Sequence, residues 1–498
     1  MRNIEHFING KLVTGSSGRH GDVFDPNTGK VQARVALANA AELDLAVQSA
    51  AAAQPAWAAV NPQRRARVMM EFVRLLEAHK EELSALLASE HGKVLSDAHG
   101  DVQRGLEVIE FVCGIPQLQK GEYTQGAGPH IDVYTAYQPL GVVAGVTPFN
   151  FPAMIPMWMF GPAIATGNAF ILKPSDRDPS TSLRLAELML EAGLPPGILN
   201  VVNGDKEVVD AIVAHPQIKA VSFVGSSDVA QAVYAAGASH GKRMQCMGGA
   251  KNHGIVMPDA DLDQVVADLM GAAYGSAGER CMALPVVVPV GEATANALRA
   301  KLLPAIKALK VGLSGDPGAH YGPLVTAAHK ARIEGYIQLG VDEGAELVID
   351  GRGLKIPGHE AGFFLAPTLF DHVTAKMKTY REEIFGPVLQ IVRAESFEEA
   401  LALPSRHQYG NGVSIFTRNG DAAREFADRV EVGMVGINVP IPVPVSYHGF
   451  GGWKRSGFAD LNQYGMDSVR FFTRTKIITQ RWPRDGEEVQ SSFVIPTM

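Results

Sequence analysis

The uncharged stretch from Val133 to Leu172 constrains the fold of this chain more than any other feature. Its hydrophobicity alone would suit a membrane span. However, five prolines and four glycines divide it into pieces too short to cross a bilayer as a helix. The alternative is a strand over 141–146, a turn, a buried helix and a second strand over 169–172, as in the interior of a parallel α/β sheet. We therefore expect no membrane span.

The rest of the chain alternates between helical and strand-like patterns. Apolar residues recur at helical spacing over 41–53, 64–90, 102–112, 180–192 and 207–214, and strand-like runs cover 197–202 and 220–224. A second pattern has strands expected over 255–257, 286–290, 365–370, 388–392 and 413–416, and helices over 262–274, 293–309 and 397–402. Strands alternating with helices predict right-handed crossovers and mostly parallel sheets, so the expected fold class is α/β.

Length and charge exclude several classes of function. A chain of 498 residues exceeds what one hydrophobic core usually supports, so two or three domains are expected. The 52 acidic and 45 basic side chains give a net charge of −7 without runs of like charge, which argues against a nucleic-acid or membrane surface. The 15 histidines show neither paired i, i+4 spacing nor clusters with cysteine, so we predict no metal site.

Cysteine usage indicates the cellular compartment. Cys113, Cys246 and Cys281 are odd in number and far apart, which is typical of a reducing compartment rather than of a disulfide framework. The first residues carry neither an apolar signal core nor an amphipathic presequence rich in Arg and Ser. We expect a cytoplasmic protein.

Cys281 is the candidate nucleophile. It lies in residues 278–283 (Gly-Glu-Arg-Cys-Met-Ala), and the charge of the adjacent Arg280 would lower the pKa of its thiol. The alternative on these residues alone is a buried, inert cysteine. A second segment, residues 146–152 (Val-Thr-Pro-Phe-Asn-Phe-Pro), places Asn150 in an apolar setting. Asn150 is either a satisfied turn amide or a donor of an oxyanion hole for thiolate attack on a carbonyl.

The two segments together resemble the aldehyde dehydrogenase superfamily. Three further motifs occur in the family's order and roughly its spacing: Lys173-Pro174-Ser175, residues 222–226 (Ser-Phe-Val-Gly-Ser) and residues 381–387 (Arg-Glu-Glu-Ile-Phe-Gly-Pro). The resemblance implies a Rossmann-like NAD-binding domain over 1–120 and 139–250 and an α/β catalytic domain over 251–467. A β-strand oligomerisation arm is expected over 121–138 and 468–490, where β-branched and aromatic residues are frequent. The implied assembly is a homodimer or a homotetramer.

The resemblance also implies the cofactor site. No Gly-x-Gly-x-x-Gly fingerprint follows a strand, but the family uses a variant in which Gly225 and Ser226 open the relevant helix. Ser226 could equally serve only as a helix N-cap, and Lys173 with Asp176 only as a solvated pair. In the family, the matching lysine and carboxylate hold the adenosine ribose, which favours NAD over NADP. The full set of residues expected to bind NAD is Thr147, Phe149, Lys173, Asp176, Arg177, Gly225, Ser226, Met247, Glu383 and Phe385.

One departure from the superfamily decides the expected chemistry. Most members carry Glu-Leu-Gly-Gly-Lys upstream of the cysteine, and that glutamate activates the hydrolytic water. Residues 245–253 here read Gln-Cys-Met-Gly-Gly-Ala-Lys-Asn-His, which we interpret as Cys246 in place of the glutamate. A thiol cannot hold water as a carboxylate base does, so the thioester would remain for a thiol such as CoA. Glu279 is the one nearby carboxylate that could take over as base.

This pattern, with Arg280 before Cys281, resembles the CoA-acylating methylmalonate-semialdehyde dehydrogenase family. The resemblance implies a short 3-oxo acid as substrate, whose second carboxylate an arginine would bind through two parallel hydrogen bonds. Arg280 is one candidate and Arg104 the other, although Arg104 alone could be a surface helix charge. The expected reaction is NAD-dependent oxidation of methylmalonate or malonate semialdehyde to propionyl-CoA or acetyl-CoA with loss of carbon dioxide. A hydrolytic aldehyde dehydrogenase and a catalytically silent relative are the alternatives.

Overall fold

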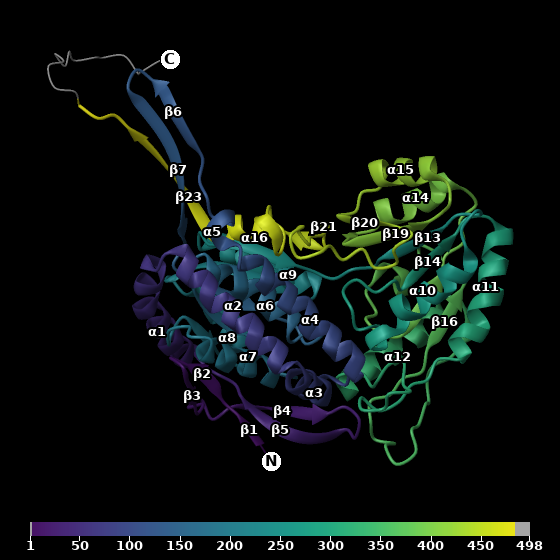
Figure 1. Cartoon of the computed structure of the whole chain (residues 1–498). Helices are drawn as coiled ribbons and strands as arrows, with labels where there is room; N and C mark the ends of the chain where they lie inside the picture. Colours follow the sequence, from purple (N-terminus) through teal and green to yellow (C-terminus); the bar gives the residue numbers. More distant parts are fainter. Residues whose placement is uncertain (1, 484–498) are drawn as a thin grey trace.

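The computed structural model describes residues 2–483, which form two lobes and a protruding arm (Figure 1). Each lobe contains a mostly parallel sheet with helices packed around it. The two main hydrophobic cores correspond to the two sheets. The α/β fold class predicted from the alternating patterns is therefore confirmed.

The first lobe contains an eight-stranded sheet. The five central strands β12, β11, β8, β9 and β10 are parallel, and the strands at both edges pair antiparallel. The order across the sheet is β22 (Gly457–Phe458), β12 (Arg243–Met247), β11 (Ile218–Val224), β8 (Val142–Val146), β9 (Ala169–Lys173), β10 (Leu199–Val201), β2 (His6–Ile8) and β3 (Lys11–Val13).

The helices of the first lobe surround this sheet. They are α1 (Ala40–Ala59), α2 (Pro62–Ala78), α3 (Lys80–His91), α4 (Leu95–Val112), α5 (Ile115–Leu118), α6 (Met154–Ala165), α7 (Ser180–Glu191), α8 (Lys206–Ala214) and α9 (Ser227–Ser239). The single helical pattern predicted over 64–90 is two helices, because the backbone leaves the helical conformation at His79 (φ −107°, ψ 14°). No glycine or proline marks this break in the sequence.

The uncharged stretch folds as predicted, with β8, α6 and β9 all buried. Helix α6 begins without a side-chain cap of its own. Instead, Asp101 of α4 accepts a hydrogen bond from the Met154 N–H (2.8 Å) and another from the Lys93 ammonium (3.0 Å). None of the described helices is long and apolar enough to span a membrane.

The second lobe contains a seven-stranded sheet that is parallel except at β15. Its order is β15 (Glu346–Ile349), β16 (Thr368–Asp371), β17 (Val388–Ile391), β14 (Val286–Pro289), β13 (His253–Val256), β19 (Gly412–Phe416) and β20 (Met434–Ile437). The helical segments are α10 (Leu262–Tyr274), the 3-10 helix η1 (Gly275–Gly278), α11 (Glu292–Lys307), α12 (Ala327–Asp342), α13 (Lys378–Arg381), α14 (Phe397–Arg406) and α15 (Gly420–Arg429).

Three small sheets complete the fold. Near the N-terminus, β1 (Arg2–Ile4), β5 (Lys30–Ala36) and β4 (His20–Asp25) form one of them. A second joins β18 (Tyr409–Gly410) to β21 (Trp453–Lys454). The arm is the third, in the order β23 (Thr473–Gln480), β7 (Ile131–Pro139) and β6 (Tyr123–Gly128), and it extends away from both lobes (Figure 1).

The end of the chain departs from the expected boundaries. Residues 468–471, predicted as the start of an arm strand, belong to the helix α16 (Gly465–Phe471). Val469, Phe471 and Phe472 are buried in the core of the first lobe, which favours a packed helix over an exposed strand. Strand β22 lies in the sheet of the first lobe, although residues 251–467 were predicted to belong to the catalytic domain. The predicted arm residues beyond 483 lie outside the described part.

Candidate active site

The predicted cofactor residues follow the carboxyl ends of neighbouring parallel strands. Strand β8 leads to Thr147, Phe149 and Asn150, β9 to Lys173, Asp176 and Arg177, β11 to Gly225 and Ser226, and β12 ends at Met247. Ligands of open α/β sheets bind outside these ends. The fold thus brings together segments that lie far apart in the sequence.

A groove of about 300 Å³ opens beside these ends. Among the predicted residues, it is lined by Phe149, Asn150, Arg177, Gly225, Ser226, Cys281, Glu383 and Phe385. The other four predicted cofactor residues, Thr147, Lys173, Asp176 and Met247, do not line this cavity. His329 and Arg332 of α12 line it as well, and nothing in the sequence pattern pointed to them.

The groove has the features that a dinucleotide requires. Ser226 occupies the N-cap position of α9 without a side-chain cap bond, and a helix N-terminus favours a phosphate. Gly248, which also lines the groove, allows the backbone to pack closely against residue Arg455. A Cβ at Gly248 would lie only 2.5 Å from the Arg455 carbonyl oxygen. Outside the groove lining, at the end of β9, Lys173 is buried, and this burial lowers the pKa of its ammonium while nearby Asp176 opposes the shift.

Glu383 lies deep in the groove. Its carboxylate accepts a hydrogen bond from the Ala250 N–H (2.8 Å), and burial raises its pKa to about 7. Gly249 is required beside it, because a Cβ there would lie 2.5 Å from Glu383 Oε2. The buried Lys251 donates to the carbonyl oxygens of Thr379 (2.8 Å) and Glu382 (2.9 Å), which fixes the segment that carries Glu383.

The loop that carries Cys281 follows an unusual left-handed turn. Ser276, Ala277 and Gly278 have φ values of 54°, 52° and 73°. Such values are costly for residues other than glycine and occur preferentially at functional sites. At Gly278 the backbone also packs closely against the motif of residues 381–387. A Cβ at Gly278 would lie only 2.1 Å from the Gly386 carbonyl oxygen.

Two asparagines hold the Cys281 backbone. The side-chain amides of Asn252 and Asn411 donate to the Cys281 carbonyl oxygen at 3.0 and 3.2 Å. Asn252 also donates to Ala283 O (2.8 Å) and accepts from the Gly412 N–H (2.9 Å). These hydrogen bonds tie the Cys281 loop to the start of β19.

Cys281 lines both the groove and a second cavity of about 250 Å³, which we call the substrate tunnel. Arg104 and Arg280, the two residues predicted to bind a substrate carboxylate, both line this tunnel. Arg104 donates to Glu107 (2.8 Å) and to the Pro444 carbonyl oxygen (2.7 Å). The apolar wall of the tunnel consists of Phe151, Met154, Trp158, Met282, Ile441, Val443 and Phe450.

The prediction that Arg280 lowers the pKa of the Cys281 thiol is wrong. Arg280 donates to Asp97 at 2.6 Å, so its charge is already paired. Burial raises the pKa of the thiol to about 12, and the negative charge of Glu383 adds to the shift. In the chain by itself, the thiol is protonated at neutral pH.

The structure corrects the interpretation of Cys246. Its side chain is fully buried in the core of the first lobe on β12, and its burial raises the pKa of the thiol to about 12. The family's glutamate lies four residues before the lysine, and four residues before Lys251 is Met247. Because successive strand residues point to opposite faces, Met247 and Cys246 cannot both face the active site. In either register, no carboxylate occupies the base position.

Glu279 does not face Cys281 across either cavity. Its fully buried carboxyl group accepts from the Val325 N–H (3.3 Å) and lies near two histidines, His91 and His329. Burial raises its pKa to about 8. The geometry therefore gives no support to Glu279 as a base for water at the thioester.

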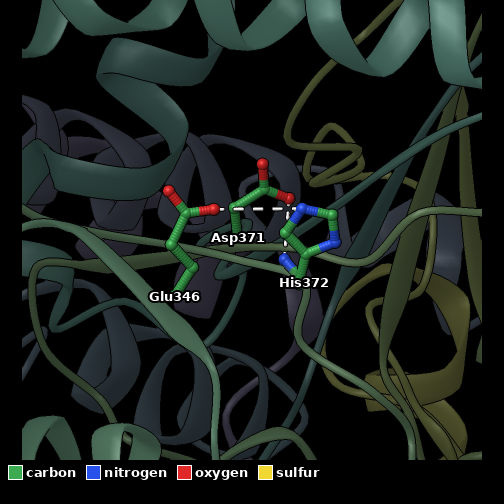
Figure 2. A group of neighbouring side chains, drawn as sticks. All are labelled: Glu346, Asp371 and His372. Atoms are coloured by element: carbon green, nitrogen blue, oxygen red, sulfur yellow. Dashed lines mark hydrogen bonds and ion pairs between the residues drawn. The ribbon is translucent and has the colours of Figure 1, made fainter.

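A group of possible metal ligands lies in the second lobe and lines neither cavity. Figure 2 shows Glu346, Asp371 and His372 close together. Arg299 donates to Asp371 (2.9 Å) and to Glu346 (2.8 Å), and Arg393 donates to Asp371 (2.7 Å). These guanidinium groups already neutralise the carboxylates, so the arrangement is an ion-pair network.

Comparison with known proteins agrees with this geometry. The model of the aldehyde dehydrogenase family matches residues 12–478, so the chain belongs to that family, as its motifs predicted. It is 56% identical to malonate-semialdehyde dehydrogenase of Pseudomonas aeruginosa, over the full length of both chains. It is 47% identical, over 99% of its length and 81% of the relative, to the acylating, mitochondrial methylmalonate-semialdehyde dehydrogenase of Arabidopsis thaliana.

A solved structure is similar over almost the whole chain. It is described as a methylmalonate-semialdehyde dehydrogenase from Sinorhizobium meliloti 1021 complexed with NAD. It is 62% identical, its TM-score is 0.97, and the match covers 98% of this chain and 99% of that chain. The predicted aldehyde dehydrogenase fold is thus confirmed.

Proposed function

We propose that this protein is an NAD-dependent, CoA-acylating dehydrogenase of malonate and methylmalonate semialdehyde. The observation that carries the proposal is the cavity pair that shares Cys281: a groove with dinucleotide-binding features on one side and a tunnel with two arginines on the other. The full-length similarity to relatives with these activities supports the choice of substrate. The missing carboxylate upstream of Cys281 favours CoA over water as the acceptor.

The residues suggest a role for each group. The Cys281 thiolate adds to the aldehyde carbon, and the Asn150 amide with the Cys281 N–H stabilises the resulting oxyanion. Arg104 and Arg280 bind the substrate carboxylate, and Phe149, Glu383 and Phe385 hold the nicotinamide end of NAD. When NAD is bound, the nicotinamide ring would accept the hydride, and its positive charge would lower the pKa of the Cys281 thiol.

The later steps release the product. The carboxylate leaves as carbon dioxide, and the carbon that carried it takes up a proton. The CoA thiol then attacks the thioester carbonyl, so that the bond to Cys281 breaks and acyl-CoA leaves. The proton given up by the CoA thiol balances the proton taken up by carbon.

The product test separates this proposal from the hydrolytic alternative. Purified protein is incubated with malonate semialdehyde and NAD, with and without CoA, and the products are identified by mass spectrometry. We expect acetyl-CoA, carbon dioxide and NADH in equal amounts, with little turnover when CoA is omitted. Free acid formed at the same rate without CoA would refute the proposal, and a complete lack of NADH would favour a silent relative.

Assembly and location are further parts of the proposal. We propose that the arm pairs subunits into a homodimer or homotetramer, because an exposed strand edge is an aggregation liability in a monomer. The exposure of Ile477 (69%) and Tyr123 (59%) on the arm supports this role. The cytoplasmic location predicted from the three unpaired cysteines stays a prediction, which cell fractionation would test.

A further inference from the structure

The groove wall is backed by a buried polar cluster that the proposed chemistry does not use. We define the cluster as His91, at the end of α3, Glu279, two residues before Cys281, and His329, in the first turn of α12. Glu279 is 0% exposed and His91 is 1% exposed. The cluster therefore joins three separate elements directly behind the site.

The hydrogen bonds of the cluster define its protonation. His329 Nε2 lies 2.8 Å from the Phe385 carbonyl oxygen, which can only accept, so Nε2 carries the proton. The same nitrogen lies 3.4 Å from Glu279 Oε1, which also accepts from the Val325 N–H. The His329 N–H is directed at Phe385, so the hydrogen bond that Oε1 accepts comes from Val325, and a proton on the carboxyl group therefore resides on Oε2.

The other half of the cluster has no hydrogen bond to the described residues. Glu279 Oε2 lies 4.0 Å from His91 Nε2, and neither atom has a partner within that part of the chain. A fully buried carboxylate without a paired cation is costly. Lys93 and Arg177 are the charged groups that act on Glu279 and favour its ionised form, but burial outweighs both.

The cluster also supports the aromatic residues of the groove. The Phe149 ring lies 5.8 Å from His91, 5.8 Å from His329 and 5.9 Å from Phe385, measured between ring centroids. Phe149 directly precedes Asn150, and Phe385 has a left-handed backbone with φ of 62°. A shift of Glu279 would thus move the Cys281 loop and this wall together.

We infer that Glu279 is a positioning residue, held as a neutral carboxylic acid, that fixes the Cys281 loop against the aromatic wall of the cofactor groove. It acts through His329, His91 and Phe149 and does not touch the substrate. Its ionisation would place a negative charge in the cluster and pull the His329 N–H away from Phe385. The site would therefore loosen as the pH rises through about 8, the pKa of the buried Glu279 carboxyl.

The test compares Glu279→Gln, which mimics the neutral acid, with Glu279→Ala. The control is Glu395→Gln, which removes the charge of an exposed glutamate. NAD affinity is measured by titration calorimetry from pH 6.5 to 9.5. The rate of Cys281 alkylation by iodoacetamide in the presence of NAD is followed by peptide mass spectrometry, which separates Cys281 from Cys113. Neither readout needs the semialdehyde, so a wrong substrate assignment would not affect the result.

We expect Glu279→Gln to match the unmodified protein near pH 7 and to exceed it in NAD affinity and alkylation rate above pH 8. Glu279→Ala should lose about 10- to 100-fold in the alkylation rate at every pH, the scale of a misplaced reacting group. The control should follow the unmodified protein throughout. Each readout is expressed as the ratio of its value in Glu279→Gln to its value in the unmodified protein. Because both proteins contain Cys281 and Glu383, the titration of these two residues cancels in the ratio.

Two results would overturn the inference. If Glu279→Gln loses as much as Glu279→Ala, the ionised carboxylate is needed and Glu279 acts as a base. If the ratio between Glu279→Gln and the unmodified protein stays constant across the pH range, the neutral acid has no positioning role. This second criterion holds even if Glu279→Ala fails to fold.

Discussion

At the scale of single residues, the proposed reaction depends on the absence of a carboxylate at the position of the family's base. The Met247→Glu variant should restore a carboxylate there and raise the CoA-independent rate of acid formation by about 10- to 1,000-fold, the range of a positioned general base. Cys246→Glu is the matched control, since it buries a charge in the core and should lower the melting temperature without raising that rate. A larger gain from Cys246→Glu than from Met247→Glu would show that Cys246, and not Met247, occupies the position of the family's glutamate.

The two arginines of the tunnel should discriminate between substrates. Replacement of Arg104 or Arg280 by leucine should reduce kcat/KM for malonate semialdehyde far more than for propanal, because only the first has a carboxylate to bind. A lost buried ion pair is worth about 2–5 kcal/mol. Arg104 is the stricter test, since Arg280→Leu would also leave the mostly buried Asp97 carboxylate without its cation. Equal losses on both substrates would mean that the arginines support the fold or Cys281 instead.

At the scale of elements, the sequence predicted the strands and helices whose burial follows a simple pattern. The β8–α6–β9 unit was predictable because prolines and glycines divide the uncharged run into pieces too short for a membrane helix, which favours buried elements of an α/β sheet. The break at His79 was not, because it depends on how α2 and α3 pack. Residues 468–471 have a strand-like composition, but the core of the first lobe buries them as a helix, which illustrates how tertiary contacts override local preference.

The residues of the candidate site likewise divide into those that the sequence predicts and those that only the fold reveals. The motifs predicted Cys281, Asn150, Glu383 and Arg280, because each of these residues lies within a recognisable segment. Asp97, His329 and the tunnel residues Ile441 and Val443 come from elements far along the chain, and only the fold brings them to Cys281. The pKa of the thiol could not be predicted either, since the neighbour in sequence, Arg280, pairs with Asp97.

The turn before Cys281 gives a prediction at this scale. Gly278→Ala should lower the burst rate of NADH formation by about 100-fold, the scale of a displacement of about 1 Å at a reacting group, because the new Cβ would collide with the Gly386 carbonyl oxygen. Gly275 is a poorer test, as its Cβ would meet the Arg280 guanidinium and would also disturb the pair with Asp97. Gly344→Ala, which also replaces a left-handed glycine but has open space around it, is the matched control. Similar losses in both variants would assign the effect to backbone strain alone.

At the scale of the whole molecule, the arm is the feature that a monomer would not need. The Ile477→Asp variant should reduce the mass measured by light scattering to that of a smaller assembly, because it places a charge on the exposed face of β23. Leu12→Asp, at a similarly exposed apolar residue on β3 (57%), should leave the mass unchanged. A monomeric unmodified protein would contradict the proposed role of the arm.

The central claim is that Cys281 forms a thioester that only a thiol removes efficiently, and rapid mixing without CoA tests it most directly. The unmodified protein, mixed with NAD and malonate semialdehyde, should give a burst of about one NADH per active subunit followed by very slow turnover, and added CoA should restore a steady rate. Cys281→Ala should give no burst while still binding NAD. Fast turnover without CoA in the unmodified protein would contradict the account and assign the enzyme to the hydrolytic branch.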